Sequence, residues 1–422
     1  MDDLVCGIDF GTSNSAVAVY NVSTCEPSPH NERLCRPIPS LLYFPTAERK
    51  SVFVGDEAIS SYVSSNFRGR FLQALKTFLT ASSFTETRIN GIRYELPDLV
   101  ALIIKHLKKT AEEATSAQIN RVVLGRPVKF AGESRDEDLA MKRLRHAAEL
   151  AGFKEVSFEF EPVAAARYYQ TLVQKRELVL VGDFGGGTSD FTLMELCPPL
   201  SKGASSDSTV FGTSGVPFAG NKFDSELMRG KMLHHFGHGS KWWADDKWLH
   251  IPHYIFVDIC EWHQIPFLRE RRTLEFLRDV RQRSTDPDGV GNLIKLIFDN
   301  YGYSVFQRIE EAKIRLSSAD ITKIQCDLKG SSFQEPVSIV EFDQLIQVHI
   351  DSIVSSVETL LNSHNVRLDQ IDNVFLTGGT SEVRAVKHLF ARLFGPEKIR
   401  TGKTFTSVAE GLGITAGLTY KC

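Results

Sequence analysis

The sequence predicts an α/β fold divided into two large lobes, and three observations support this prediction. The chain has 422 residues, which is more than one ordinary hydrophobic core holds. Two segments, which begin at Leu4 and Leu178, share one design: a buried strand, a glycine turn with hydroxyl side chains and a returning strand. Elsewhere, strand patterns alternate with helical patterns. The repeated design predicts two related lobes that face each other across a cleft.

The elements of the first lobe follow in order. The first strand-turn-strand segment covers residues 4–20. Apolar side chains recur at helical spacing within 98–115, which predicts a helix, and an apolar strand follows at 121–127. A second helix is expected at about 134–151, because Gly152 offers a C-cap.

The second lobe begins with the strand-turn-strand segment at 178–193. Residues 201–215 are rich in Ser and Gly and are expected to form a loop. Helices are expected at 293–317 and 342–364, and a last strand at 373–377 runs into two glycines and another helix.

These elements divide the chain into three parts. Residues 1–176 are expected to form the first lobe and residues 177–365 the second. The second lobe includes an insertion at about 237–288 that holds all four tryptophans. Residues 366–422 are expected to return to the first lobe and close the cleft.

Composition and charge argue against several classes of function. The formal net charge of -3 gives no general attraction for nucleic acid or for an anionic membrane. Apolar runs such as 99–104 are too short to span a bilayer, and the start Met1-Asp2-Asp3 shows no signal peptide. The seven cysteines include no Cys-x-x-Cys pair, which favours reduced thiols. We therefore expect a cytoplasmic protein that binds neither nucleic acid nor membrane.

The two glycine turns are candidate phosphate sites. Backbone N–H groups in a glycine turn approach phosphate oxygens closely, because no side chain intervenes. Asp9 and Asp183 end buried strands, where a carboxylate needs a counterion, and a hydrated Mg²⁺ would supply that charge. Either turn alone is equally compatible with an ordinary hairpin capped by Asp. Two such turns in one chain weaken that alternative.

The same residues carry a resemblance to a known family. Residues 7–15 and 183–190 resemble the phosphate loops of the heat-shock protein 70 family, the DnaK-type chaperones. Further family landmarks follow in the expected order, and together these motifs are specific although each alone is not. The further landmarks are 161–166, Gly220 with Asn221 and Asp224, 310–317 and 376–380.

The resemblance implies an actin-like ATPase fold, in which each lobe has a ribonuclease-H-like mixed sheet flanked by helices. It also implies slow hydrolysis of ATP, with ATP or ADP and Mg²⁺ bound between the lobes and the Mg²⁺ held mainly through water by Asp9 and Asp183. The implied catalytic residues are Asp9, Lys76, Glu161, Asp183, Thr188 and Asp190. The implied nucleotide-binding residues are Gly11, Thr12, Ser13, Asn14, Gly185, Gly186, Gly187, Gly220, Asn221, Glu310, Lys313, Ile314, Ser317, Gly378, Gly379 and Thr380.

Individual roles come from the same resemblance. Glu161 and Asp190 are candidates to orient or deprotonate the attacking water. Lys76, with the hydroxyl of the second turn, would stabilise charge that develops on the γ-phosphate. Lys76 matches the family's lysine by position alone, so a solvated surface lysine is an alternative. Lys313 could contact the ribose, or it could form a surface ion pair of small energetic value.

The sequence departs from the family pattern at three positions. Ile314 stands where most of the family has an Arg that stacks on adenine, so base contacts are expected to be weaker or purely apolar. Glu382 stands where a basic residue is common, and Phe405 stands where an acidic residue is usual. These changes put nucleotide affinity and base choice in question more than the phosphate chemistry.

The region after the last landmark also differs from the family. No acidic-hydrophobic linker and no β-rich substrate domain follow in this sequence. The chain therefore resembles the short YegD-like branch, which lacks the substrate-binding domain. Peptide chaperoning of the usual family type is not expected from it.

The insertion at about 237–288 and its N-terminal flank contain six histidines and the four tryptophans. A metal site there is not favoured, because the histidine spacing is irregular and no recognised Asp, Glu or Cys pattern surrounds a pair. The tryptophans are expected to pack or to contact a protein partner. The histidines are His234, His235, His238, His250, His253 and His263.

The sequence is compatible with three functions. The leading hypothesis is a nucleotide-driven ATPase whose cleft closure follows the nucleotide state. The second is a non-hydrolysing module that binds nucleotide and presents the insertion to a partner. The third is a small-molecule kinase on the same scaffold, which is disfavoured because no sugar-binding motif stands out.

Overall fold

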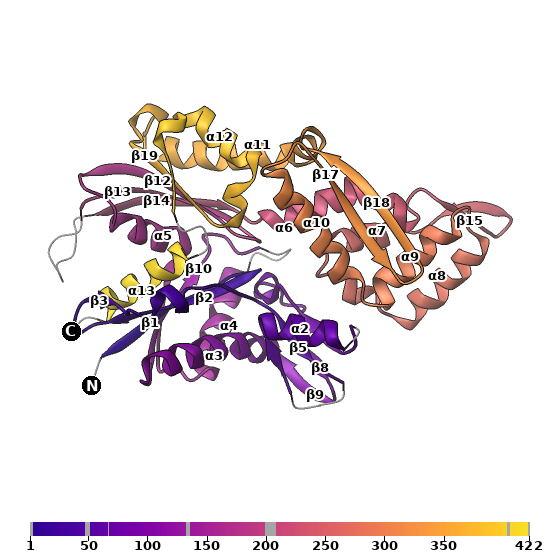
Figure 1. The fold of residues 1–422 in the computed structure, drawn as a ribbon, viewed down its shortest axis with the longest axis horizontal. Helices are drawn as coiled ribbons and strands as arrows, with labels where there is room; N and C mark the ends of the chain where they lie inside the picture. The colour runs from indigo at the N-terminus through magenta and orange to yellow at the C-terminus, as the bar shows by residue number, and fades with distance from the viewer. Residues whose placement is uncertain are drawn as a thin grey trace.

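The computed structural model describes residues 3–46, 51–65, 67–131, 136–198, 208–402 and 406–420. The chain folds into two lobes, each built on a mixed β-sheet, and the two ends of the chain lie close together beside the first lobe (Figure 1). Among the described residues, no helix combines the length and the apolar content that crossing a bilayer requires.

The sheet of the first lobe has the strand order β11-β10-β1-β2-β3, and β4 also pairs with β2. The central strand β1 is antiparallel to β2, to which the first glycine turn joins it, and parallel to β10. The strands are β1 (Leu4–Phe10), β2 (Asn14–Asn21), β3 (Glu26–Pro27), β4 (Ile38–Pro39), β10 (Arg121–Arg126) and β11 (Glu155–Phe160).

The sheet of the second lobe repeats this plan with the order β14-β13-β12-β19-β20. Its central strand β12 is antiparallel to β13, across the second glycine turn, and parallel to β19. The matched topology confirms the predicted α/β fold with a mixed sheet in each lobe. The strands are β12 (Glu177–Phe184), β13 (Ser189–Leu196), β14 (Thr209–Val216), β19 (Asn373–Thr377) and β20 (Ile399–Thr401).

Helices cover both faces of each sheet. Helices α3 (Leu96–Thr115) and α4 (Glu137–Leu150) pack together against the first sheet. Helices α11 (Ile339–Ser363) and α12 (Arg384–Phe394) cover the second sheet on its outer face. The helices are amphipathic, so burial of one apolar face holds each in place.

Two further helices lie between the two sheets and join the lobes (Figure 1). They are α5 (Glu161–Gln170) and α13 (Ser407–Thr419). Their small side chains, such as Ala164 and Ala416, share one core with Val5 of the first sheet and Val181 of the second. The molecule is therefore a stack of helices, sheet, helices, sheet and helices, and the two glycine turns meet beside the central layer.

The outer part of the first lobe holds short elements. These are α1 (Asn31–Leu34), β5 (Leu42–Phe44), β6 (Phe53–Val54), α2 (Asp56–Ser64), β7 (Arg70–Leu72), η1 (Leu75–Phe78), β8 (Glu86–Ile89) and β9 (Ile92–Glu95).

The outer part of the second lobe extends to the right in Figure 1 and contains two hairpins among helices. One helical run begins with α6 (Gly220–Leu227) at the cleft and continues through the π-helix η2 (Met228–Met232) and the 3₁₀-helix η3 (Leu233–Phe236). The other elements are β15 (Lys241–Ala244), β16 (Lys247–His250), α7 (His253–Cys260), η4 (Ile265–Leu268), α8 (Arg271–Arg283), α9 (Pro287–Phe298), α10 (Gly302–Leu316), β17 (Ile321–Leu328) and β18 (Ser331–Ser338).

Two expectations about the chain need correction. Residues 209–215 are not a loop, because they lie in β14, which pairs along β13. The segment 366–422 does not return to the first lobe as one piece, because β19 and β20 complete the second sheet and α12 packs on it. Of the described elements in this segment, α13 is the one that lies against β1 and β2 of the first lobe. The remaining short elements are η5 (Leu368–Gln370), η6 (Gly379–Glu382) and η7 (Pro396–Lys398).

Candidate functional site

A cavity of about 440 Å³ lies between the two lobes, at the place where both glycine turns end. Every residue that the sequence assigned to catalysis or nucleotide binding lines this cavity, with Asp190 as the one exception among them. Some other lining residues were not assigned to catalysis or nucleotide binding from the sequence. Those from the described part of the chain are Ser15, Ala16, Pro37, Glu382, Val383 and Val408.

The two glycine turns approach each other so closely that their sequences are constrained. The Ser13 hydroxyl of the first turn donates a hydrogen bond of 3.2 Å to the Asn221 side chain at the start of α6. A Cβ atom on Gly186 of the second turn would lie 2.1 Å from the Ser13 Oγ. A side chain at this position would displace the Ser13 hydroxyl from Asn221, so the close approach of the two turns favours glycine there.

A third turn, after β19, completes the rim of the cavity. Gly378 has a φ of 81°, and a Cβ atom there would lie 2.2 Å from the carbonyl oxygen of Phe184. The Thr380 hydroxyl donates a hydrogen bond of 2.8 Å to the Gly185 carbonyl. The Leu-Thr-Gly-Gly-Thr motif therefore packs directly on the second phosphate turn, as parallel pairing of β19 with β12 requires.

Lys76 is buried, so the alternative of a solvated surface lysine is wrong. It lies in η1, where Ala74 adopts a left-handed conformation with a φ of 50° just before the helix. Its Nζ lies 2.5 Å from the Oε1 of Glu161, the first residue of α5. The ion pair places one cation in the cavity beside the carboxylates that end β1 and β12.

The carboxylates around Lys76 outnumber it. Burial raises the pKa of Asp9 to about 7, and the negative charge of Glu161 adds to this rise while Lys76 opposes it. Burial raises the pKa of Asp183 well above its usual range, with further contributions from Glu161, Asp9 and Asp190. The group as a whole therefore carries more negative charge than one lysine balances, and it favours either protons or a further cation.

Asp190 lies beneath the cavity rather than on its wall. Its side chain is fully buried, and its Oδ1 accepts a hydrogen bond of 2.8 Å from the backbone N–H of Val128. Its Oδ2 has no hydrogen-bond partner among the described residues. Burial and then the charge of Glu161 raise its pKa to about 7. Asp190 thus adds to the negative field of the site but does not reach the cavity surface.

The donor set of the cavity fits a hydrated Mg²⁺. Asp9 and Asp183 both face the cavity and offer hard carboxylate oxygens, while the described lining residues include no His and no Cys. A small dication prefers such oxygen ligands and keeps several of its waters. The excess of buried carboxylate over lysine is the charge that this cation would balance, and the neighbouring backbone N–H groups suit phosphate oxygens.

Helix α10 contributes Glu310, Lys313 and Ile314 to the wall of the cavity. Lys313 is buried on this helix, where its Nζ lies 2.8 Å from the Oδ2 of Asp224 and donates to the Gly220 carbonyl at 3.2 Å. The pair joins α10 to α6 and is not a surface ion pair. Ile314 lies at the rim, where 61% of it is exposed.

The other two residues that depart from the family pattern are Glu382 and Phe405, and the structure describes only the first. Glu382 lines the cavity, and its carboxylate lies 2.6 Å from the Nζ of Lys387 on α12. Phe405 lies outside the described residues. The missed residues Pro37 and Val408 reach the cavity only through tertiary packing, so no local pattern marked them.

Comparisons with known proteins match most of the chain. A family model described as "Hsp70 protein" matches residues 5–241 and 303–420. The chaperone protein DnaK of Thermosipho melanesiensis is 24% identical over 424 residues, which cover 99% of this chain and 59% of that protein. The chaperone protein DnaK of Thermosipho africanus is 23% identical with the same coverage. The family match leaves out residues 242–302, which hold most of the insertion.

Proposed function

Because the chain belongs to the Hsp70 family, we propose that its cavity binds ATP with Mg²⁺ and slowly hydrolyses the terminal phosphate. One observation carries this proposal: a buried lysine and an excess of carboxylates meet where two glycine turns face each other. That is the arrangement that phosphoryl transfer needs, since such catalysis rests on positioning and charge stabilisation more than on covalent chemistry.

Each turn has a separate task in this proposal. The backbone N–H groups of Gly11 and Gly186 bind phosphate oxygens, and Thr12 and Thr188 add hydroxyl donors beside them. A Mg²⁺ bound near Asp9 and Asp183 would neutralise charge on the phosphates. Both turns contact the same phosphate chain, so nucleotide binding holds the lobes together.

Lys76 and Glu161 act on the reacting end of the nucleotide. Lys76 donates N–H groups to the oxygens of the γ-phosphate, where negative charge grows during the reaction. Glu161 then orients the attacking water as a hydrogen-bond acceptor. Their 2.5 Å contact gives Lys76 a carboxylate partner at the reacting end of the cavity.

The nucleoside lies against α10 and the turn after β19. Glu310 and Ser317 offer polar groups to the ribose, because Lys313 is already engaged by Asp224. Ile314 offers the base an apolar contact with no guanidinium plane. Discrimination between adenine and guanine is therefore expected to be weak, and competition between ATP and GTP measures it.

A single-turnover assay tests the proposal. Enzyme in excess over ATP should release phosphate in the presence of Mg²⁺ and not in the presence of EDTA. Asp183→Asn should retain the fold and lose Mg²⁺-dependent release. Release that is no faster than in buffer rejects the ATPase, and release that requires an added hydroxyl substrate replaces it with a kinase.

A second candidate function is nucleotide-dependent presentation of a binding surface without hydrolysis. It is favoured by residues 242–302, which the family model does not match. The hairpin β15–β16 exposes 42% of Trp243 and 50% of Trp248, whose rings meet edge to face at 5.5 Å. Trp242, by contrast, packs against Phe276 of α8. Exposed paired tryptophans suit a protein partner.

The two candidates give different results for one variant. Replacing Trp243 and Trp248 by Ser should leave thermal stability and ATP turnover unchanged. If the protein presents a binding surface without hydrolysis, the wild type binds nucleotide without turnover. The Trp243→Ser/Trp248→Ser variant then still binds nucleotide but no longer binds the protein partner. Turnover in the wild type decides for the ATPase.

A chaperone-like role forms the broader part of the proposal. The DnaK relatives are named chaperones, and this chain spans 59% of the length of those proteins. We assign to the chain the nucleotide-driven closure of two lobes. We also propose a reducing compartment such as the cytoplasm, which agrees with the free state of the cysteines in the described part of the chain.

A further inference from the structure

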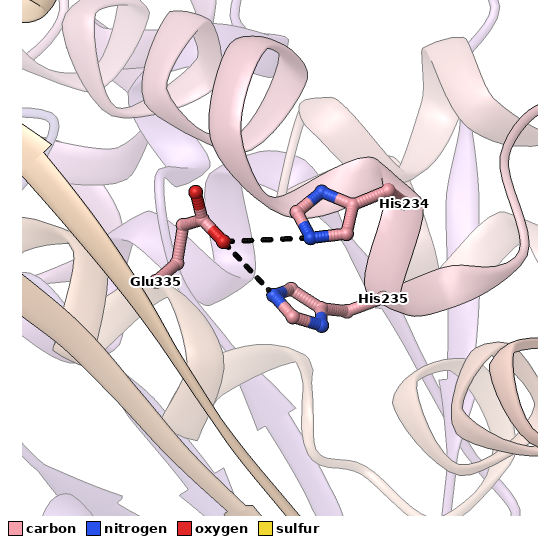
Figure 2. A group of neighbouring side chains, drawn as sticks. All are labelled: His234, His235 and Glu335. Atoms are coloured by element: carbon pink, nitrogen blue, oxygen red, sulfur yellow. Dashed lines mark hydrogen bonds and ion pairs between the residues drawn. The ribbon is translucent and has the colours of Figure 1, made fainter.

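Two adjacent histidines and a distant glutamate meet in the outer part of the second lobe. His234 and His235 lie on η3, and Glu335 lies on β18 (Figure 2). The Oε2 of Glu335 is 3.4 Å from the Nε2 of His234 and 3.2 Å from the Nε2 of His235. Both rings thus point their Nε2 atoms at one carboxylate oxygen, as Figure 2 shows.

These separations match those of ligands around one transition-metal ion. Nitrogen and oxygen ligands lie about 2.0–2.1 Å from zinc in a tetrahedral site, which sets ligand atoms about 3.3–3.4 Å apart. The three candidate ligand atoms all lie within 4.8 Å of one another. Binding would therefore need only small side-chain movements.

The surrounding residues hold the ligands in place. Lys231 of η2 lies 3.4 Å from the other oxygen of Glu335. The ring of His235 stacks on Phe333 with centroids 4.3 Å apart and planes 16° apart. The Asn292 side chain donates to the His235 carbonyl at 3.1 Å. Such outer contacts orient the ligands of known metal sites.

We propose that His234, His235 and Glu335 bind a zinc-type divalent metal ion, with a water molecule at the remaining position. Two imidazole nitrogens and one carboxylate form a donor set suited to Zn²⁺ and poorly suited to Mg²⁺. His234 has 58% of its side chain exposed, which leaves room for the water and a path of entry.

The site is separate from the nucleotide cavity, because none of its three residues lines that cavity. It would clip η3 to the hairpin β17–β18. This link lies at the far end of the helical run α6–η2–η3, which begins at the cavity with Gly220 and Asn221. The sequence argued against a metal site because the histidine spacing is irregular and no recognised acidic pattern surrounds the histidines. The sequence could not indicate Glu335 as a ligand, because this residue is far from both histidines along the chain.

Metal binding is measured on the whole chain without nucleotide. Titration calorimetry with Zn²⁺ should show one site, and excess Mg²⁺ should not compete for it. Co²⁺ should produce the absorption bands of a four-coordinate ion when it replaces Zn²⁺. His234→Ala and Glu335→Gln should each weaken Zn²⁺ binding by at least about a hundredfold, more than the 10–100-fold typical of outer contacts.

The matched control is His253→Ala, which removes an exposed histidine from the same outer part of the lobe. It should bind Zn²⁺ like the wild type. His234→Ala is the safer of the two test variants because the side chain is largely exposed, and circular dichroism confirms its fold. Equal Zn²⁺ affinity in the wild type and His234→Ala, or no four-coordinate Co²⁺ spectrum, overturns the proposal.

Discussion

Two buried lysine–carboxylate pairs lie at the same cavity, where Lys76, Glu161 and Lys313 line the wall and Asp224 lies behind Lys313, but the surroundings of the two pairs differ. Lys76 lies 2.5 Å from Glu161, and the charges of Asp9 and Asp190 act on it as well. Lys313 lies 2.8 Å from Asp224, and both side chains are less than 10% exposed. Lys76 therefore has the charges of three carboxylates acting on it, whereas the second pair has the charge of Glu310 beside its own two charges.

The difference in surroundings indicates that the two buried lysine–carboxylate pairs have different roles. Burial by itself lowers the pKa of Lys76, but Glu161 and Asp9 more than offset this and raise the pKa. A lysine held charged among surplus carboxylates is ready to act on phosphate and on a cation. The second pair joins α6 to α10, and burial raises the pKa of Asp224 to about 7 although Lys313 opposes the rise. We therefore expect the first pair to serve chemistry and the second to serve the fold.

The largest effect is expected from removing the structural lysine. Lys313→Met leaves the Asp224 carboxylate buried without its cation, which typically costs about 3–5 kcal/mol. The apparent melting temperature, measured by circular dichroism, should fall strongly. The double variant Lys313→Met/Asp224→Leu should recover most of the loss, and a double variant as unstable as the single one contradicts a paired role.

The next effect concerns chemistry at the first pair. Lys76→Met should slow ATP hydrolysis by about 10²–10³-fold, the usual result of removing one donor to a developing charge. Nucleotide affinity, measured by calorimetry with ADP and Mg²⁺, should change much less. A variant that hydrolyses normally but binds ADP poorly would assign Lys76 to ground-state binding instead.

The surplus of carboxylates around the first pair predicts a pH effect. The pKa of Asp190 is about 7 in the folded chain, above its usual value of 3.8, so the folded state keeps a proton that the unfolded state releases. Stability should therefore fall as the pH rises between about 4 and 7, by at most about 4 kcal/mol at 1.4 kcal/mol per pKa unit. Above that window the loss is complete.

Asp190→Asn isolates this contribution from those of Asp9, Asp183 and Lys76, whose pKa values are also raised. Asn has no charge to lose, and its side-chain oxygen can still accept from Val128. The drop in melting temperature from about pH 5 to pH 8, measured without nucleotide, should be smaller in the variant. An equal drop in both proteins means that Asp190 does not titrate in this window.

The smallest effect is expected at an exposed pair of similar geometry. Arg271 lies 2.7 Å from Glu275 on α8, with 90% and 57% of the side chains exposed. Glu275→Gln should change stability by less than about 0.5 kcal/mol, because water screens the pair. Thermal unfolding measures it. A large loss of stability would show that the distance between the charges, and not their burial, decides how much an ion pair contributes to stability.

Local patterns predicted much of the site. The two turns, Glu161 and the Glu310–Ser317 face each lie in short motifs, and the structure brings them to one cavity. The doubled strand-turn-strand design also predicted the two related sheets, because a turn between two strands is a local feature. Where a residue and its neighbours in sequence carry the information, the structure places the residue at the cavity as the motif indicated, and the role of the residue stays a prediction.

The features that the sequence did not predict depend on packing between residues far apart in the chain. The partners of Lys313 and His235 come from distant elements, so neither Asp224 nor Glu335 could be matched to them from spacing. Residues 209–215 belong to the segment 201–215, which was expected to be a loop because it is rich in Gly and Ser. Pairing with β13 outweighs that weak local preference in 209–215. The burial of Lys76 likewise depends on α5, which lies far along the chain.

One measurement tests the contrast between the two lysines most directly. Single-turnover phosphate release at saturating ATP and Mg²⁺ is compared for Lys76→Met and Lys313→Met, at a temperature where both variants are folded. We predict that Lys76→Met is at least about tenfold slower than Lys313→Met, because only Lys76 stabilises charge on the γ-phosphate. Equal rates, or a slower Lys313→Met, would contradict the assignment of Lys76 to chemistry and Lys313 to the fold.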